Sequence, residues 1–478
     1  IMQEKAIVYR QIEKDIDEHV SDLVALIRQP SVSPQNIGVV ETAKLLRSML
    51  GEVGFSGTRL VETSGNPVVY GRMDTGARTT VLLYGMYDTM PADEQGWNVD
   101  PFAGTIMEME PFGRTLVARG AINTKGPLMG FLNSVSSILK SGQDLPVNII
   151  FVAEGEEELG SRHLPEFIKS MEDELKEADV LFFPAASQNS RGKAVISLGV
   201  KGIVYFELEV DGANCRKGPV EFGIHGSNKA WVDSPTWRLL KALSSMVDET
   251  GNRVMIEGFY DNVSVPTLED ELLVQKLSTT FDEEEIKERM RVDRFIDDLH
   301  GVDALRKYLF SPTLNINGIW SGYTGPGTKT LLPSKITAKV DVRLVPNMRV
   351  EEVIPMIRGH LDKFGFEEVE IRELESGYSW ARMNANSTYA QALINSLAEF
   401  VTDSEIWPTT AGSAPFSMFA APPLKLPFIT GGMGHGGRAH SPNEYLVIGE
   451  GGPTGGFVTM EKSFVSILYN LSDIKGKD

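Results

Sequence analysis

The strongest constraint on the fold is an alternation of short apolar runs with helical segments, which begins near residue 65. Strand-like runs rich in β-branched and aromatic residues are predicted at 79–84, 146–155 and 179–185, with helices at 126–142 and 160–178 between them. Continuous apolar strands separated by helices of this length are typical of a parallel sheet that is covered on both faces. We therefore expect an α/β domain with a mostly parallel sheet.

A different pattern begins near residue 200. Residues 201–212 and 335–346 alternate polar and apolar side chains, which indicates antiparallel strands, and helices are predicted at 234–247 and 350–366. With a last strand at 368–377 this order is a β-α-β-β-α-β-like unit, an α+β sandwich. The α/β pattern returns after about residue 385. The second domain is therefore expected to be inserted into the first, which gives three segments, 1–200, 201–384 and 385–478.

Composition excludes several classes of protein. A chain of 478 residues favours two domains, and its formal net charge of −19 argues against a nucleic-acid partner, which would require a basic face. No apolar run approaches the ~18 residues of a membrane span, and the polar, acidic first 20 residues do not resemble a signal peptide. The single cysteine, Cys215, fits a cytoplasmic protein.

Polar residues follow each predicted strand. Because ligands bind beyond the carboxyl ends of parallel strands, these residues are expected at one edge of the sheet. Carboxylates and histidines gathered there indicate a metal site or an acid–base site. The candidates are Met86 and Asp88; Glu154, Glu156, Glu157 and Glu158; Arg119, Asn123 and Lys125; and His435, Arg438, His440 and Glu444.

Each signal also has a purely structural interpretation. Acidic residues in a first helical turn are favoured by the helix dipole, so the run "EGEEELGS" is ambiguous by itself. Alternatively, one glutamate could hold a metal while its neighbour acts on the bound water, since adjacent helical residues point about 100° apart. A lone His440 is more often structural. The loop "GYTGPGTKT" does not qualify as a phosphate-binding loop, because Thr328 separates Gly327 from Lys329.

Several motifs together resemble a known family. These are "YGMYDTMPADEQGWNVDPF", "RGAINTKGP", "EGEEELGS", "IHGSNKAWVDSPTWRLL", "NINGIWSGYTGPGTKTLLP", "DVRLVP", "AGSAPF" and "AHSPNE". In order and spacing they are similar to the co-catalytic zinc or manganese exopeptidases and deacylases that include cytosolic nonspecific dipeptidase, carnosine dipeptidase and acetylornithine deacetylase. The resemblance implies a catalytic α/β domain with an inserted lid and dimerisation domain, and hence a homodimer.

The resemblance also implies a metal site that this sequence does not preserve in full. The family's first histidine ligand falls at Met86, its bridging aspartate at Asn123, and its third carboxylate at Ala185 or nearby Ser187. Glu158 and His440 match the two remaining ligands. A thioether is a soft ligand that suits Cu(I) better than Zn²⁺ or Mn²⁺. We expect one divalent metal held by Glu158, His440 and Asn123, with help from His435, Asp88 or substrate, or no metal at all.

The other family positions are retained. By resemblance, Glu157 is the general base, Asp88 orients the histidine that is missing here, and His225 reaches the partner subunit's active site to stabilise an oxyanion. Arg343, Thr330, Gly412 and Ser413 match the positions that hold a substrate carboxylate, for which the planar arginine fork is suited.

Three functions remain open from the sequence. The first is hydrolysis of an amide or related C–N bond in a small, carboxylate-bearing substrate with a single metal. The second is a metal-independent acid–base enzyme on the same scaffold, which catalyses hydrolysis, elimination or isomerisation through Glu157, Asp88, His440 and His225. The third is a binding protein without catalysis, against which the retained Glu157 argues.

Overall fold

A computed structural model describes residues 2–474, apart from the side chains of residues 375 and 376. The chain divides into two compact units. Unit 1 contains the chain up to Gly199, residues Arg382–Thr410 and the chain from Pro415 onward, whereas unit 2 contains Val200–Ala381 and Ala411–Ala414. No helix within the described part is both long and apolar enough to cross a membrane.

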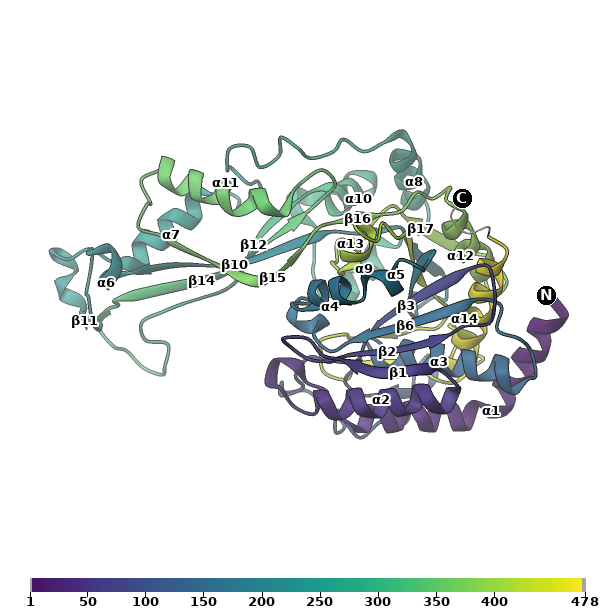
Figure 1. Ribbon diagram of the computed structural model, residues 1–478. Coiled ribbons are helices and arrows are strands. Elements are labelled where there is room, and N and C mark those ends of the chain that lie inside the picture. Colours follow the sequence, from purple (N-terminus) through teal and green to yellow (C-terminus); the bar gives the residue numbers. More distant parts are fainter. Residues whose placement is uncertain (1, 475–478) are drawn as a thin grey trace. The chain divides into compact units, whose positions relative to one another are not determined.

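Unit 1 is a mixed α/β structure (Figure 1). Its main helices are α1 (Met2–Arg28), α2 (Val39–Val53), α3 (Lys125–Lys140), α4 (Leu164–Ser170), α5 (Glu172–Leu175), α12 (Thr388–Ala398), α13 (Phe416–Ala420) and α14 (Phe457–Ser472). Its strands are β1 (Ser56–Val61), β2 (Val68–Met73), β3 (Thr80–Met86), β4 (Thr105–Met109), β5 (Gly113–Val117), β6 (Asn148–Glu154), β7 (Val180–Pro184), β8 (Ala194–Ser197), β17 (Ser404–Trp407), β18 (Phe428–Gly431), β19 (Gly436–Gly437) and β20 (Tyr445–Val447).

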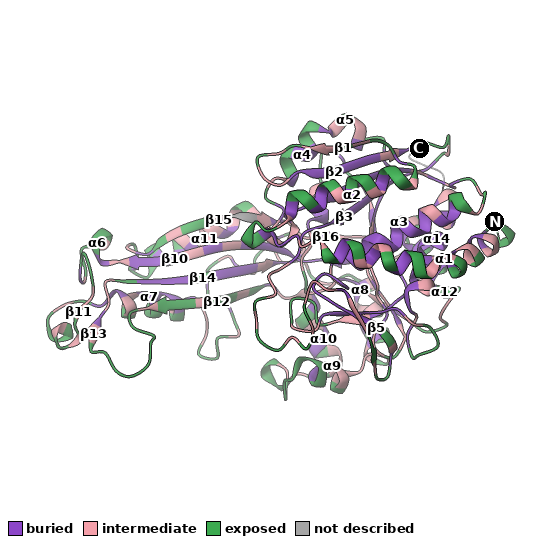
Figure 2. Cartoon of the chain, turned by 90° about the horizontal axis from the view of Figure 1, so that it is seen from below, coloured by how far each residue is buried: buried purple, intermediate pink, exposed green. Residues whose placement is uncertain are grey.

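The central sheet has the strand order β1-β2-β6-β3-β7-β18. The pairs β6–β3, β3–β7 and β7–β18 are parallel, whereas β1 and β2 add an antiparallel edge. Strand β3 is buried along its whole length, as its continuous apolar sequence predicts (Figure 2). The predicted α/β class with a mostly parallel sheet is therefore confirmed.

Helices cover both faces of this sheet. On one face Phe131 of α3 packs edge-on against Phe182 of β7 and contacts Phe464 of α14. On the other face Tyr84 of β3 packs against Phe416 and Phe419 of α13. Because helices cover both faces, the carboxyl ends of the strands remain as the edge at which polar residues gather.

A second, smaller sheet joins distant parts of unit 1. Its strand order is β19-β20-β5-β4, and Tyr445 of β20 pairs with Val117 of β5. The residues that follow β5 therefore lie beside the loop that joins β19 to β20. That loop contains His440, so this sheet positions it.

Unit 2 is built on one antiparallel sheet with the order β12-β14-β10-β15. Its strands are β9 (Gly199–Val200, at the border with unit 1), β10 (Gly202–Asp211), β11 (Ile224–His225), β12 (Thr313–Ser321), β13 (Leu331–Leu332), β14 (Lys335–Leu344), β15 (Glu370–Tyr378) and β16 (Ala381–Arg382, again at the border). Its helices are α6 (Gly212–Cys215), α7 (Pro235–Ser245), α8 (Leu268–Ser278), α9 (Glu283–Met290), α10 (Gly301–Phe310) and α11 (Val350–Lys363). The elements β10, α7, β12, β14, α11 and β15 follow the predicted β-α-β-β-α-β order, and the helices α8, α9 and α10 are inserted between α7 and β12.

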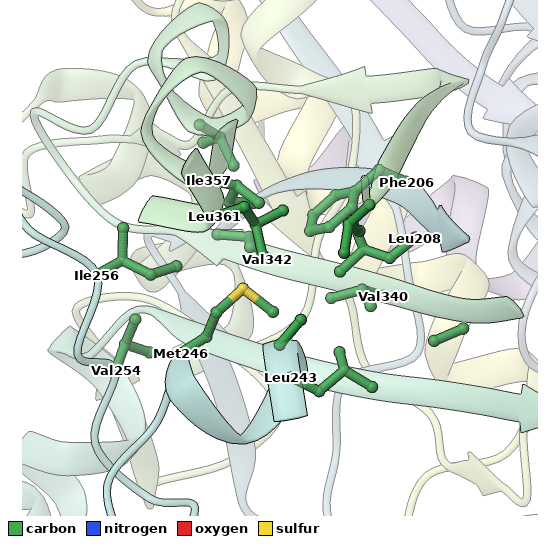
Figure 3. Packing of buried hydrophobic residues seen from close by; sticks show 14 of the residues in the cluster. Phe206, Leu208, Leu243, Met246, Val254, Ile256, Val340, Val342, Ile357 and Leu361 are labelled. Atoms are coloured by element: carbon green, nitrogen blue, oxygen red, sulfur yellow. The ribbon is translucent and has the colours of Figure 1, made fainter. Parts of the chain in front are cut away.

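The core of unit 2 lies between this sheet and two helices. Phe206 and Leu208 of β10 and Val340 and Val342 of β14 point toward α7 and α11, as Figure 3 shows. Met246, which follows α7, is fully buried within the same cluster. On the other face of β14, Lys335 and Lys339 are exposed, whereas Thr337 and Asp341 are buried.

Two local expectations are corrected. The helix predicted over 160–178 begins only at Leu164 and is broken at Met171, so Glu157 and Glu158 lie in a three-residue 3₁₀ turn, η2 (Glu157–Leu159), which Gly160 ends at φ 81°. Residues 411–414 were expected in the first domain but group with unit 2. The reason is local, because the Lys201 N–H donates to the Gly412 carbonyl at 2.9 Å.

Helices α1, α3 and α14 are joined by a buried polar contact. The Glu461 carboxylate, with no exposed surface, accepts hydrogen bonds from His19 Nδ1 at 2.7 Å and from Asn133 Nδ2 at 3.0 Å. Burial raises the pKa of Glu461, while the bond from His19 opposes the rise. Such a contact is costly to break, because its remaining partners stay buried without an acceptor.

We expect Glu461→Ala to lower the free energy of unfolding by roughly 2–4 kcal/mol, because it adds a cavity to the lost hydrogen bonds. Urea unfolding measures the change. The matched control is Glu13→Ala, which removes an exposed glutamate of α1 that pairs with Lys462 of α14. That surface pair should contribute no more than about 1 kcal/mol. Equal losses in the two variants would contradict the prediction.

Candidate active site

The candidate site lies at the carboxyl ends of β3 and β6. In their parallel ladder Met86, the last residue of β3, pairs with Glu154, the last residue of β6. Asp88 follows β3 by two residues, and the turn η2 follows β6 by three. The sequence rule that polar residues gather at this edge therefore places Asp88, Glu157 and Glu158 near one another.

Asp88 holds the glutamate turn in place. Its fully buried carboxylate accepts hydrogen bonds from the backbone N–H groups of Glu157 at 3.2 Å and Glu158 at 3.1 Å, and from the Ser33 hydroxyl at 2.6 Å. Burial raises the pKa of Asp88 well above its usual range, and the nearby Glu158 carboxylate adds to the rise. Asp88 therefore positions the backbone of Glu157 and Glu158.

Asn123, Glu158 and His440 contact one another. Asn123 Nδ2 donates to Glu158 Oε1 at 2.7 Å and lies 3.3 Å from His440 Nε2, while His440 Nε2 lies 3.1 Å from Glu158 Oε2. The three residues come from the segment after β5, from η2 and from the β19–β20 loop. The structure therefore brings together the three side chains that the resemblance assigned to a metal.

The protonation of this cluster is set by burial and charge. Burial raises the pKa of Glu157 well above its usual range, and the Glu158 and Asp88 carboxylates raise it further. The hydrogen bond with Glu158 raises the pKa of His440 above its usual value. Glu157 is half-buried and precedes Glu158, the residue whose hydrogen bond favours the protonated imidazole of His440. A carboxyl group and an imidazole with raised pKa values are groups suited to proton transfer.

At the other positions that the resemblance assigns to the metal, the side chains are buried or hydrogen-bonded elsewhere. Met86 is buried and only 6% exposed. Ser187, near Ala185, donates its hydroxyl to the Gly432 carbonyl at 2.8 Å. His435 places Nδ1 2.8 Å from the Gln188 carbonyl and Nε2 3.0 Å from the Tyr445 hydroxyl, so both ring nitrogens have partners away from Glu158.

The residues present do not make a complete site for Zn²⁺ or Mn²⁺. Among residues 2–474 no group of three or more His, Cys, Asp or Glu side chains is arranged to hold a metal. Catalytic zinc sites use three protein ligands, whereas Glu158 and His440 supply two. The third side chain, Asn123, turns its amide nitrogen, a donor, toward Glu158.

His225 and Thr330 lie side by side in unit 2. His225 of β11 pairs with Leu331 of β13, and the Thr330 carbonyl accepts the Gly226 N–H at 3.4 Å. Both side chains are exposed. His225 Nδ1 lies 2.8 Å from the Ser227 hydroxyl, so Nε2 is the other ring nitrogen of this exposed side chain.

Arg343 and Ser413 form a second group in unit 2. Arg343 Nη1 donates to Ser413 Oγ at 2.7 Å, and its Nε lies 3.5 Å from Asp341. Gly412 is fixed beside them by its bond from Lys201. Thr330 precedes β14, whereas Arg343 lies near the far end of this strand. Because a strand rises roughly 3.3 Å per residue, the two groups are more than about 20 Å apart. The structure does not bring them together within unit 2.

Sequence reasoning missed a network behind the glutamate turn. The buried Glu154 carboxylate accepts hydrogen bonds from the Tyr84 hydroxyl and, at 2.7 Å, from the Ser161 hydroxyl. Burial raises the pKa of Glu154 to about 7. Ser33, which contacts Asp88, was also missed. No local signal marks Ser33, because it lies 55 residues from its partner.

The raised pKa of Glu154 predicts a pH-dependent stability. The unfolded carboxyl group titrates near 4.5 and the folded one near 7, so its contribution to stability is lost as the pH rises through this window. As the pH rises from 5 to 8, the free energy of unfolding of the wild type should fall by on the order of 1–3 kcal/mol relative to that of Glu154→Gln. Urea unfolding of both proteins at each pH measures this. Parallel pH curves would exclude it.

Comparisons with known proteins identify the family. The sequence pattern of peptidase family M20/M25/M40 matches residues 82–451. The Cys-Gly metallodipeptidase dug1 of Schizosaccharomyces pombe is 28% identical over 496 aligned positions, which cover 98% of each chain. Human Beta-Ala-His dipeptidase is 33% identical over 299 residues, and this match spans 62% of the present chain but only 56% of the human enzyme.

A solved structure agrees with this result. The M20 family metallo-carboxypeptidase Sso-CP2 from Sulfolobus solfataricus has a TM-score of 0.86 and 32% sequence identity, and the match covers 96% of this chain and all of that one. These findings confirm the family resemblance of the motifs and the hydrolase class that it implies. The chain belongs to peptidase family M20/M25/M40.

Proposed function

We propose that this protein hydrolyses the amide bond of a short peptide or a similar small substrate that carries a carboxylate. Three observations support the proposal: family membership, the names of its relatives, which are dipeptidases and a carboxypeptidase, and the retained Glu157. A cytoplasmic location is part of the same proposal, for which the free Cys215 is the supporting observation.

The observation that carries the proposal is the contact between Glu158 and His440, with Glu157 next to Glu158 in the same 3₁₀ turn. In the proposed reaction the Glu157 carboxylate takes a proton from water as the water oxygen attacks the carbonyl carbon. Protonated His440, whose pKa is raised by Glu158, gives a proton to the amine nitrogen as the C–N bond breaks. Acid and base then both come from the chain's own residues.

The substrate carboxylate is assigned to the second group in unit 2. Arg343 presents a guanidinium group whose Nη1 is oriented by Ser413. Such a planar fork binds carboxylates with two parallel hydrogen bonds. The carboxylate requirement of the substrate follows from this residue, and a substrate without the charge should bind poorly.

A single-metal enzyme is the second candidate. In this candidate Glu158 and His440, whose side chains contact each other, would hold the ion, and the ion would polarise the substrate carbonyl and activate water. Substrate or water would have to complete the ligand set. This candidate therefore predicts metal in the purified protein and loss of turnover on chelation.

We expect the purified protein to cleave members of a panel of dipeptides and N-acyl amino acids. Glu157→Gln should reduce kcat at least 100-fold, because the amide matches the carboxylate in size but does not accept the proton. C-terminally amidated substrates should have a much higher KM, because Arg343 loses its charged partner. Steady-state kinetics by amine release provides the measurement.

The control for this experiment is Glu172→Gln, an equivalent change on the surface of α5, where Glu172 pairs with Lys176. It should leave kcat and KM unchanged. Turnover that survives chelation in protein free of metal by mass spectrometry supports the metal-independent form, whereas turnover lost on chelation and restored by Zn²⁺ or Mn²⁺ supports the single-metal form. Full activity in Glu157→Gln would overturn both.

A homodimer through unit 2 is also proposed. His225 and Thr330 lie far from Arg343 within one chain, so a second copy is a natural source of these side chains for a shared site. The edge strand β12 exposes Ile316, Ile319 and Trp320 to 45%, 44% and 47%. An edge strand with exposed apolar residues is a template for pairing with another chain.

Light scattering should give a mass of twice 52.6 kDa for the wild-type protein. Trp320→Glu should convert it to a monomer, because a charge would be buried without a partner in the interface. Leu268→Glu makes the same kind of change at a 78% exposed site on α8 and should leave the mass unchanged. A monomeric wild-type protein would refute the homodimer.

A further inference from the structure

We infer that Arg119 and Glu444 act as a positioning pair that fixes Asn123 and His440 against Glu158. Neither residue has a hydrogen bond to the side chains of Asn123, Glu158 or His440. Each instead binds the backbone of a cluster residue or of its neighbour, and they contact each other through Arg119 Nη1 and Glu444 Oε1 at 3.2 Å. The catalytic part of this inference rests on the proposed function, whereas the geometric part does not.

Glu444 holds Asn123. Its carboxylate, with no exposed surface, accepts the backbone N–H groups of Ile122 at 3.1 Å and Asn123 at 3.2 Å through Oε2. Its own carbonyl accepts the Ala118 N–H at 2.9 Å. The turn after β5 is therefore bound at both ends to the residue that precedes β20, and this turn carries the Asn123 amide that donates to Glu158.

Arg119 holds the loop of His440. The guanidinium group is 2% exposed, and it donates to the carbonyl of Ser441, the residue after His440, at 3.1 Å. It also donates to the Pro91 carbonyl at 3.1 Å and to the Glu94 carboxylate. Arg119 thus joins the segment after β3 to the His440 loop, and the ring of Trp97 lies 5.1 Å from its guanidinium carbon.

The loop between β19 and β20 requires such a hold because its backbone is strained. Arg438, His440 and Asn443 have φ values of 58°, 61° and 60°, in the left-handed region that residues with a Cβ rarely adopt. Residues in this region persist when their surroundings fix them. Asn443 adds to the hold, because its side chain donates to the Gly96 carbonyl and accepts the Asn98 N–H, both at 2.8 Å.

Loss of the pair should therefore misplace His440 and Asn123 while the sheets stay folded. Glu444→Gln replaces one acceptor oxygen with an NH₂ group, which is a donor. This group would face either Arg119 or the two backbone N–H groups, which are donors as well. Arg119→Lys keeps the charge, but one ammonium group does not span the four acceptors on these two segments. A displacement of about 1 Å in a catalytic group costs on the order of 100-fold in rate.

The test combines NMR with kinetics. The chain has seven histidines, so labelling them with ¹³C and ¹⁵N gives few signals, and His440→Gln assigns the one that matters. In Glu444→Gln and in Arg119→Lys we expect the His440 signal to shift while the other histidine signals stay in place. With a substrate found in the dipeptide panel, kcat should fall about 100-fold and KM should change less than about threefold.

A matched control pair lies on the same small sheet. Glu108 and Arg114 are cross-strand partners on β4 and β5, both are exposed, and Glu108→Gln and Arg114→Lys should leave the His440 signal and kcat unchanged. An unshifted His440 signal in Glu444→Gln, or displacement of all histidine signals together, would overturn the inference. Absence of turnover in wild type would refute the proposed function alone, since the NMR result decides the positioning role independently.

Discussion

The hydrogen bonds from the backbone of Glu157 and Glu158 to the Asp88 carboxylate are the contact on which the candidate site depends. They join the ends of β3 and β6, and they form where the carboxylate has no exposed surface. A buried carboxylate is tolerated only when its oxygens are satisfied, and here two backbone donors and the Ser33 hydroxyl satisfy them. The position of both glutamates follows from this contact.

The same cluster shows how side chains can replace one another within a family fold. Asn123 donates a hydrogen bond to Glu158, whereas a carboxylate at that position would repel it. Asn123 and His440 both contact the Glu158 carboxylate. Burial raises the pKa values of Asp88 and Glu157, and the neighbouring Glu158 carboxylate raises both further.

Much of the fold follows from local sequence patterns. The continuous apolar runs of β3, β6 and β7 and the alternating runs of β10 and β14 indicated two kinds of sheet, and both are present. The helix predicted after the glutamates failed because Gly160 and Pro165 restrict its start and Met171 interrupts it. Asp88, Glu158 and His440 were found as candidates because they follow strands. Ser33 and Tyr84 were missed, because their importance comes from a contact with a distant residue.

The sequence by itself determined the residue types at the strand ends, including Met86, Asn123 and Ala185, which the family resemblance places at ligand positions. It did so because strand periodicity and motif spacing are local properties. Only the tertiary structure decided that His435 is engaged by Gln188 and Tyr445, that Asn123 presents its amide nitrogen to Glu158, and that Arg119 and Glu444 hold a strained loop. These facts depend on contacts between residues up to 325 positions apart, which no local pattern encodes.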